Sequence, residues 1–152
     1  MIRPGCNKFL RELSQYYELV VFTAAMPDYA DWILDQIDEV GYIASRLYRQ
    51  HCSPKDDYAI KDLRNLGRDL RRTIIVDNLA ENFSMTPNNG IWVESWYDDL
   101  ECQVLPTLQK FLIDLVKSDV EDVRAYLTPE SKKILYSCME SGSTIPGLPE
   151  LL

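Results

Sequence analysis

Two runs of apolar, mainly β-branched residues dominate the hydrophobic pattern of the chain: Leu-Val-Val-Phe at 19–22 and Thr-Ile-Ile-Val at 73–76. Neither run alternates with polar residues, which is typical of a strand buried on both faces of a parallel sheet. A third run, Ile-Trp-Val at 91–93, follows the turn-forming sequence Pro-Asn-Asn-Gly. We therefore expect three strands here, with residues 47–48 as a further short one.

Apolar residues that recur at intervals of three and four predict helices between and after these strands. The first helix follows Gly5, and the second begins at Pro27 and is ended by Gly41. The third covers residues 104–115, where Pro106 is tolerated only in the first turn. Because strands alternate with helices, the pattern predicts an α/β fold with a mainly parallel sheet and flanking helices.

The remaining segments are either polar or contain residues that typically begin a helix. Residues 52–57 are predicted to be a polar loop, and 118–119 and 128–130 have the composition of helix starts. Two short C-terminal helices are thus expected within residues 117–140, as an extension of the main domain. Gly, Ser and Pro in 141–152 predict a mobile tail.

The net charge of −8 argues against non-specific binding of nucleic acid, but the charge is unevenly placed. Residues 46–72 hold eight bases and four acids, a local charge of +4. This stretch is either a solvated polar face or a site for an anion. The apolar runs are too short for a membrane span, and four separated cysteines with one histidine make a zinc site unfavourable.

Residues whose side chains can bind phosphate or a metal ion directly follow the two most apolar predicted strands. Thr23 follows the first, and Asp77 and Asn78 follow the second, so these side chains are expected at the carboxyl edge of the sheet, where ligands bind. A threonine hydroxyl can bond a phosphate oxygen, and the other two supply hard oxygen ligands for Mg²⁺. Lys61 could neutralise a phosphoryl group. Each also has a structural alternative, as a cap, a turn or a solvated side chain.

Several segments in order resemble one family. They are Arg-Pro-Gly at 3–5, Val-Val-Phe-Thr-Ala-Ala at 20–25, Tyr-Arg-Gln-His-Cys at 48–52, Ile-Lys-Asp-Leu at 60–63, Leu-Gly-Arg-Asp at 66–69, Ile-Ile-Val-Asp-Asn at 74–78 and Asn-Phe at 82–83. Together they are similar to the haloacid-dehalogenase-type protein phosphatases of the NLI-interacting-factor class. That class includes the small phosphatases of the RNA polymerase II C-terminal domain (the FCP homology domain) and the Dullard-like enzymes. The resemblance covers residues 2–116.

The resemblance implies a Rossmann-like, haloacid-dehalogenase-like sheet and a Mg²⁺-dependent hydrolase that acts on phosphoserine or phosphothreonine in proteins of the nucleus or cytoplasm. It implies that Thr23 binds the transferred phosphoryl group and that Lys61 stabilises the aspartyl-phosphate. Asp77 and Asn78 would complete the Mg²⁺ site, with Asn78 the direct ligand. Arg49 would meet the substrate phosphate.

The family also places Asp-x-Asp-x-Thr, with its nucleophile and general acid, at the end of a first strand, and this chain contains no Asp-x-Asp. We therefore expect a chain shortened at its N-terminus, with an incomplete Mg²⁺ site and no activity. The missing strand would lie centrally, between 19–22 and 73–76, and would leave them about 9–10 Å apart. The two strands could close up, accept a strand from another chain, or leave the protein prone to aggregation.

Three interpretations stay open. The chain is a shortened member of a serine/threonine phosphatase family, a non-catalytic module that keeps the phosphate pocket, or a scaffold similar to the presequence receptor of the mitochondrial inner-membrane translocase. The joint presence of Thr23, Lys61 and Asn78 favours the first.

Overall fold

The computed structural model describes residues 1–55 and 57–141. The helices and strands, in chain order, are α1 (Cys6–Leu13), β1 (Leu19–Phe22), α2 (Pro27–Ile37), β2 (Ile43–Leu47), β3 (Ser53–Lys55), β4 (Tyr58–Ile60), β5 (Ile75–Asp77), β6 (Gly90–Trp92), α3 (Val104–Lys117), α4 (Val123–Tyr126) and α5 (Pro129–Ser141). Short 3-10 turns join them: η1 (Arg49–His51), η2 (Leu63–Asn65), η3 (Leu70–Arg72), η4 (Ala80–Phe83) and η5 (Pro87–Asn89).

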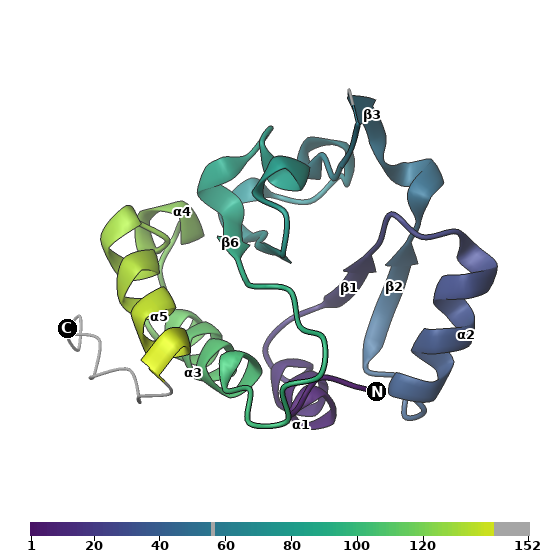
Figure 1. Ribbon diagram of the computed structural model, residues 1–152. Coiled ribbons are helices and arrows are strands. Elements are labelled where there is room, and N and C mark those ends of the chain that lie inside the picture. Colours follow the sequence, from purple (N-terminus) through teal and green to yellow (C-terminus); the bar gives the residue numbers. More distant parts are fainter. Residues whose placement is uncertain (56, 142–152) are drawn as a thin grey trace.

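The strands form three separate pairs rather than one sheet. β1 pairs with β2 and β5 with β6, both in parallel, while β3 and β4 form an antiparallel hairpin. In Figure 1 the β1–β2 pair lies beside α2, and β6 stands apart from it, nearer to α4 and α5. The α/β class with parallel strands and flanking helices is confirmed.

Among the described residues, no strand lies between β1 and β5, and these two strands do not pair with each other. Val93 donates its N–H to the carbonyl of Asp77 at 3.0 Å, so the backbone groups of Asp77 face β6. Because successive residues of a strand direct these groups to opposite edges, those of Val76 face away from β6, where the described residues offer no partner. Direct pairing of the two strands is therefore not observed.

The prediction that both strands are buried on two faces was wrong. Val20, in the middle of β1, is 43% exposed, and Val76, in the middle of β5, is 37% exposed. A strand is buried on both faces only when neighbouring strands and helices cover it, and each of these strands has one neighbour.

The main core lies among the helices. Leu108 and Phe111 of α3 are almost fully buried and pack with Leu13 of α1 and Ile91 of β6. Leu135 of α5 belongs to the same cluster and is fully buried, so the C-terminal helices complete the core of the domain. A smaller cluster under the loops contains Leu63, Ile75 and Phe83.

Helix ends differ from the prediction in two places. The second helix ends at Ile37 rather than at Gly41, because the carboxylate of Asp38 accepts the N–H groups of Tyr42 and Ile43 at 2.8 Å and turns the chain into β2. The helix expected from residues 118–119 begins only at Val123.

Local bonding explains this later start. Asp119 has a left-handed backbone (φ 48°), and Asp122 caps the helix by accepting the N–H of Arg124 at 2.9 Å.

The expected polar loop at 52–57 contains strand β3 of the hairpin. The predicted tail lies outside the described residues from 142 onward. The first turn of α3 does contain Pro106, as expected.

Candidate phosphate-binding pocket

A buried ion pair links the loop after β4 to the end of β5. Nζ of Lys61 donates to Oδ2 of Asp77, and only 11% of the lysine side chain and 2% of the aspartate side chain are exposed. The other carboxylate oxygen, Oδ1, accepts the N–H of Leu79 at 2.9 Å and the amide of Asn82 at 3.1 Å. Both oxygens of Asp77 are therefore occupied, and the charge of this carboxylate is neutralised locally.

Asn82 holds both members of the pair. Its side-chain amide donates to Asp77, while its backbone carbonyl accepts the N–H of Lys61 at 2.7 Å. It is itself buried, at the third position of η4. We did not assign it a site role from the sequence, although the Asn-Phe segment at 82–83 was the available signal.

Asn78 stands beside this pair and is exposed. Its side-chain amide donates to the hydroxyl of Ser95 at 2.9 Å, and its backbone carbonyl accepts the indole N–H of Trp92 at 2.9 Å. These bonds fix the loop after β5 against the segment after β6. The amide oxygen of Asn78 receives no hydrogen bond from the described residues.

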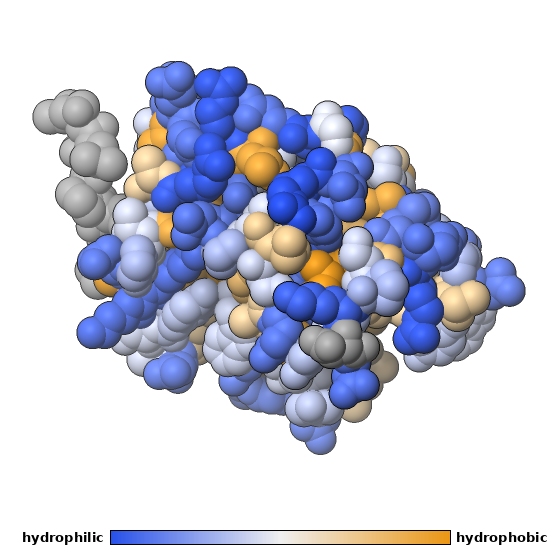
Figure 2. Space-filling model, turned by 90° about the horizontal axis from the view of Figure 1, so that it is seen from above, coloured by the Kyte–Doolittle hydropathy of each residue, from blue (hydrophilic) through white to orange (hydrophobic). Residues whose placement is uncertain are grey.

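Lys61, Asp77 and Asn78 line one cavity of about 480 Å³. The other lining residues come from the N-terminus, β5 and the segment after β6: Arg3, Val76, Val93, Glu94, Ser95, Trp96 and Tyr97. The cavity therefore combines polar and charged side chains with a few apolar ones, and the cationic group of Lys61 is held at a fixed position in it. From above, the molecule shows mainly hydrophilic side chains, with hydrophobic atoms visible in hollows between them (Figure 2).

Thr23 and Arg49 do not line this cavity. The hydroxyl of Thr23 accepts the N–H of Ala25 at 3.1 Å and does not cap α2, whose N-cap residue is Met26. Arg49 is exposed, and its Nε donates to the carbonyl of Ala24 at 2.7 Å. Thr23 thus lies on the short segment that follows β1, and Arg49, in η1 after β2, is hydrogen-bonded to that segment.

Cys52 lies between the two groups of predicted residues. Its sulfur lies 3.9 Å from the carbonyl of Thr23. Burial raises the pKa of the thiol, the positive charges of Lys61 and Arg49 lower it, and the charge of Asp77 raises it again. All three charged groups are therefore close enough to act on one sulfur atom, although only Lys61 and Asp77 touch each other.

Most arginines of the basic stretch 46–72 are paired with acids. The ion pairs are Arg46 with Asp31 and Asp35, Arg64 with Asp62, Arg68 with Glu18, and Arg71 with Asp69. For these arginines the structure supports the solvated polar face rather than an anion site.

The residues present do not fit a complete Mg²⁺ site. Protein sites for this ion use one or two carboxylates together with substrate oxygens and waters. Here the carboxylate of Asp77 is neutralised by Lys61, which leaves the amide oxygen of Asn78 and the carboxylate of Glu94 as unpaired oxygen groups among the described residues that line the cavity. Residues 1–55 and 57–141 contain no group of three acidic, histidine or cysteine side chains that could hold a metal.

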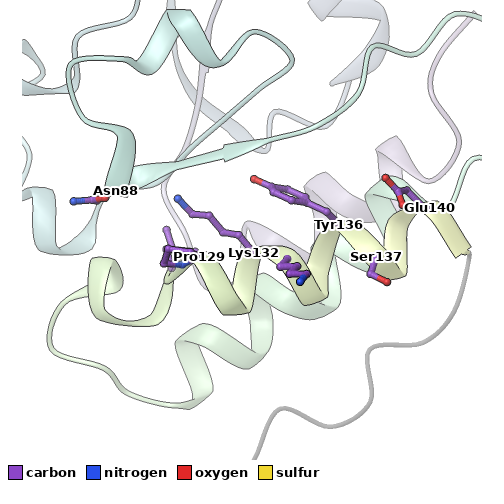
Figure 3. A pocket seen from close by; sticks show the side chains of 8 residues that line it. Asn88, Pro129, Lys132, Tyr136, Ser137 and Glu140 are labelled. Atoms are coloured by element: carbon purple, nitrogen blue, oxygen red, sulfur yellow. The ribbon is translucent and has the colours of Figure 1, made fainter.

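A second hollow, of about 570 Å³, lies along α5, and its polar groups hold that helix in place (Figure 3). Burial lowers the pKa of Lys132, whose Nζ donates to the carbonyl of Pro87 at 3.2 Å. The hydroxyl of Tyr136 accepts the N–H of Trp92 at 3.0 Å. Because this N–H belongs to β6, α5 blocks a hydrogen-bonding position on that strand.

The parallel strand pairs, with a lysine–aspartate pair and an asparagine at the carboxyl end of β5, place the protein in the class of α/β proteins with a ligand pocket at the sheet edge. The sequence matches the family described as NLI interacting factor-like phosphatase over residues 1–124. The chain belongs to this family, and the recognition from sequence motifs is confirmed.

Two relatives and one solved structure illustrate the match. The chain is 44% identical, over 82% of its length, to the Dictyostelium discoideum protein named "Probable C-terminal domain small phosphatase", and covers 40% of that protein. It is 38% identical, over 87% of its length, to the mitochondrial import inner membrane translocase subunit TIM50 of Kluyveromyces lactis, and covers 28% of it. The chain thus spans less than half the length of these relatives.

The fold is similar to that of the fission yeast RNA polymerase II CTD phosphatase Fcp1, with a TM-score of 0.55 and 20% identity over 94% of this chain and 36% of the other. At this identity the similarity concerns the fold alone. In the described part of the chain, no helix is long and apolar enough to cross a membrane.

Proposed function

We propose that this chain binds the phosphate group of a phosphorylated serine or threonine in a protein. The observation that carries the proposal is the position of Lys61: its ammonium group is held at the carboxyl end of β5, in the wall of a cavity, by a carboxylate that is nearly inaccessible to solvent. An ammonium group so placed uses one of its three donors on Asp77 and can direct another to a phosphoryl oxygen without first reorganising.

Thr23 and Arg49 are proposed to contact the same phosphate from the β1 side. The donors of Arg49 other than Nε have no partner among the described residues, and a guanidinium matches phosphate geometry. The hydroxyl of Thr23 uses its lone pair for Ala25 and keeps its proton for donation. The charge effects of Lys61 and Arg49 on Cys52 support a shared neighbourhood.

We further propose that these 152 residues do not hydrolyse the phosphoester by themselves. The aspartyl-phosphate route of the family needs a free carboxylate nucleophile, and the chain has no Asp-x-Asp pair. Asp77 cannot replace it, because its oxygens already accept from Lys61, Leu79 and Asn82. Mg²⁺ is expected to bind firmly only when further ligands join Asn78 and Asp77.

The second candidate function is a non-catalytic scaffold, and one observation favours it. The relative named as a subunit of the mitochondrial import translocase matches 87% of this chain, against 82% for the Dictyostelium discoideum phosphatase relative. The two candidates differ in the expected location of the protein: the nucleus or cytoplasm for a phosphatase, and the mitochondrion for an import scaffold.

Titration calorimetry with a phosphoserine peptide and its unphosphorylated form tests the proposal. We expect the native chain to bind only the phosphopeptide and Lys61→Met to lose most of the affinity. Lys8→Met is the matched control, because Lys8 is exposed on α1, away from the pocket. Equal affinity for both peptides contradicts phosphate binding, and release of phosphate from the peptide by the native chain contradicts the proposed inactivity.

A further inference from the structure

Arg3 lines the same cavity as Lys61, Asp77 and Asn78, although the sequence places it 58 residues before the lysine. Two hydrogen bonds hold its guanidinium in a fixed orientation. Nη1 donates to the carbonyl of Glu94 at 3.0 Å, and Nε approaches the sulfur of Cys102 at 3.3 Å. The planar group is therefore anchored on the segment after β6.

The third nitrogen of this guanidinium, Nη2, is buried and has no hydrogen-bond partner among the described residues. Buried donors of this kind are uncommon in folded proteins, because leaving one unsatisfied forfeits the hydrogen bond that water would have made. An arginine that is fixed on one side and unsatisfied on the other is arranged to receive an acceptor.

The described residues do not supply a carboxylate for this arginine. No acidic group lies within ion-pair distance of Arg3, whereas the other cation of the cavity, Lys61, is paired with Asp77. The oxygens of Asp77 are occupied by three donors, so this carboxylate is not free to turn to Arg3. Arg3 thus forms no ion pair with the described residues, although Glu94, whose carbonyl it binds, lines the same cavity.

We propose that Arg3 is a phosphate-binding residue of this cavity, with its guanidinium group donating to an oxygen of the ligand. This inference rests on the proposed function and adds to it a second cation from another part of the chain. Phosphate fits because its oxygens can accept from a guanidinium fork and an ammonium group at once. The apolar walls of Val76 and Val93 leave room for the carbon chain that carries the phosphate.

Calorimetry with inorganic phosphate and with the phosphoserine peptide tests this assignment on the 152-residue chain. We expect Arg3→Met to weaken both affinities at least tenfold. Arg3→Lys keeps the positive charge but loses the planar guanidinium, and we expect it to weaken both affinities about threefold. Arg11→Met is the matched control, because this arginine lies on the exposed side of α1 beside Glu12.

Thermal unfolding gives a second readout. Without ligand, Arg3→Met should melt close to the native chain, because an unsatisfied donor is removed together with two weak bonds. Added phosphate should raise the melting temperature of the native chain and of Arg11→Met, but not that of Arg3→Met. Native-like binding by Arg3→Met, alongside a loss in Lys61→Met, overturns the role of Arg3 and leaves the proposed function standing. Absence of phosphate binding by the native chain overturns both.

Discussion

The ammonium group of Lys61 and the carboxylate of Asp77 neutralise each other although their backbones belong to separate strand pairs. Lys61 follows the β3–β4 hairpin and Asp77 ends β5, and Asn82 bridges them, with its backbone carbonyl on Lys61 and its side-chain amide on Asp77. The ion pair thus attaches the β3–β4 hairpin to the β5–β6 pair and contributes to the stability of the pocket.

Breaking this pair on one side should be strongly destabilising. Lys61→Met leaves a buried carboxylate without its counter-ion, and we expect a loss of about 3–5 kcal/mol in the free energy of unfolding. The double variant Lys61→Met/Asp77→Leu removes both charges and should recover most of that loss. Denaturant unfolding of the three proteins measures this, and additive losses in the double variant would contradict the coupling.

Asn82→Ala should destabilise the pocket through lost hydrogen bonds. It removes the donor to Oδ1 of Asp77 and leaves that buried oxygen with one partner fewer, at a cost of about 1–3 kcal/mol. The matched control is Asn88→Ala, an exposed asparagine in the next 3-10 turn, which should stay within about 0.5 kcal/mol of the native chain. Similar losses in the two variants would show that the bond to Asp77 contributes nothing specific.

Gly90→Ala should be destabilising for reasons of packing. The backbone of Gly90 is extended (φ −98°), a conformation open to any residue, but an added Cβ would overlap the ring of Phe83. We expect a loss of about 1–3 kcal/mol, as for other overpacked cores. In a Phe83→Leu background the same substitution should cost much less, and an unchanged cost there would point to the backbone instead.

The uncovered strands should make the isolated chain bind a hydrophobic dye at neutral pH. Val20 and Val76 expose apolar surface in the middle of β1 and β5, next to backbone groups without partners. The double variant Val20→Thr/Val76→Thr should lower dye fluorescence several-fold. Val40→Thr is the control, since this valine is 73% exposed but lies in the loop after α2. A native chain that is monomeric and ignores the dye would contradict the expectation.

Cys52 should react slowly with iodoacetamide at neutral pH. Burial raises its pKa, and the opposing effects of Lys61 and Arg49 come second to it, so the thiol stays protonated near pH 7. The rate should rise with pH as the thiolate forms. Because Arg49 lowers this pKa, Arg49→Gln should slow the reaction further. Mass spectrometry of the alkylated peptide follows the rate, and faster labelling of Arg49→Gln would reverse the assigned sign.

The sequence predicts the elements of the fold well where the signal is local. The apolar run at 73–76 with Asp77 and Asn78 behind it identifies both β5 and the position of the pocket, because strand formation and the end of a strand depend on neighbouring residues. Pro27 and Pro129 likewise begin α2 and α5, as their fixed φ favours.

The rest depends on partners that are distant in the chain. Burial of Val20 and Val76 was overestimated, because burial is a property of the neighbouring strands and not of the run itself. Arg3 is anchored by Glu94, 91 residues away, so no local pattern marks it as part of the pocket. Gly90 belongs to a turn-forming sequence, but glycine is required there because a Cβ would overlap the ring of Phe83.

The placement of α5 also has a consequence for the synthesis of the protein. Of the buried residues in the main core, only Cys138 is synthesised after Leu135. The hydroxyl of Tyr136 can accept the N–H of Trp92 only when α5 has formed. A nascent chain that pauses after α4 therefore has α3 covered by α1 but not by α5, and β6 with an open donor. Apolar surface exposed in this way is what makes a folding intermediate prone to aggregation, so the domain is protected only once α5 has been synthesised.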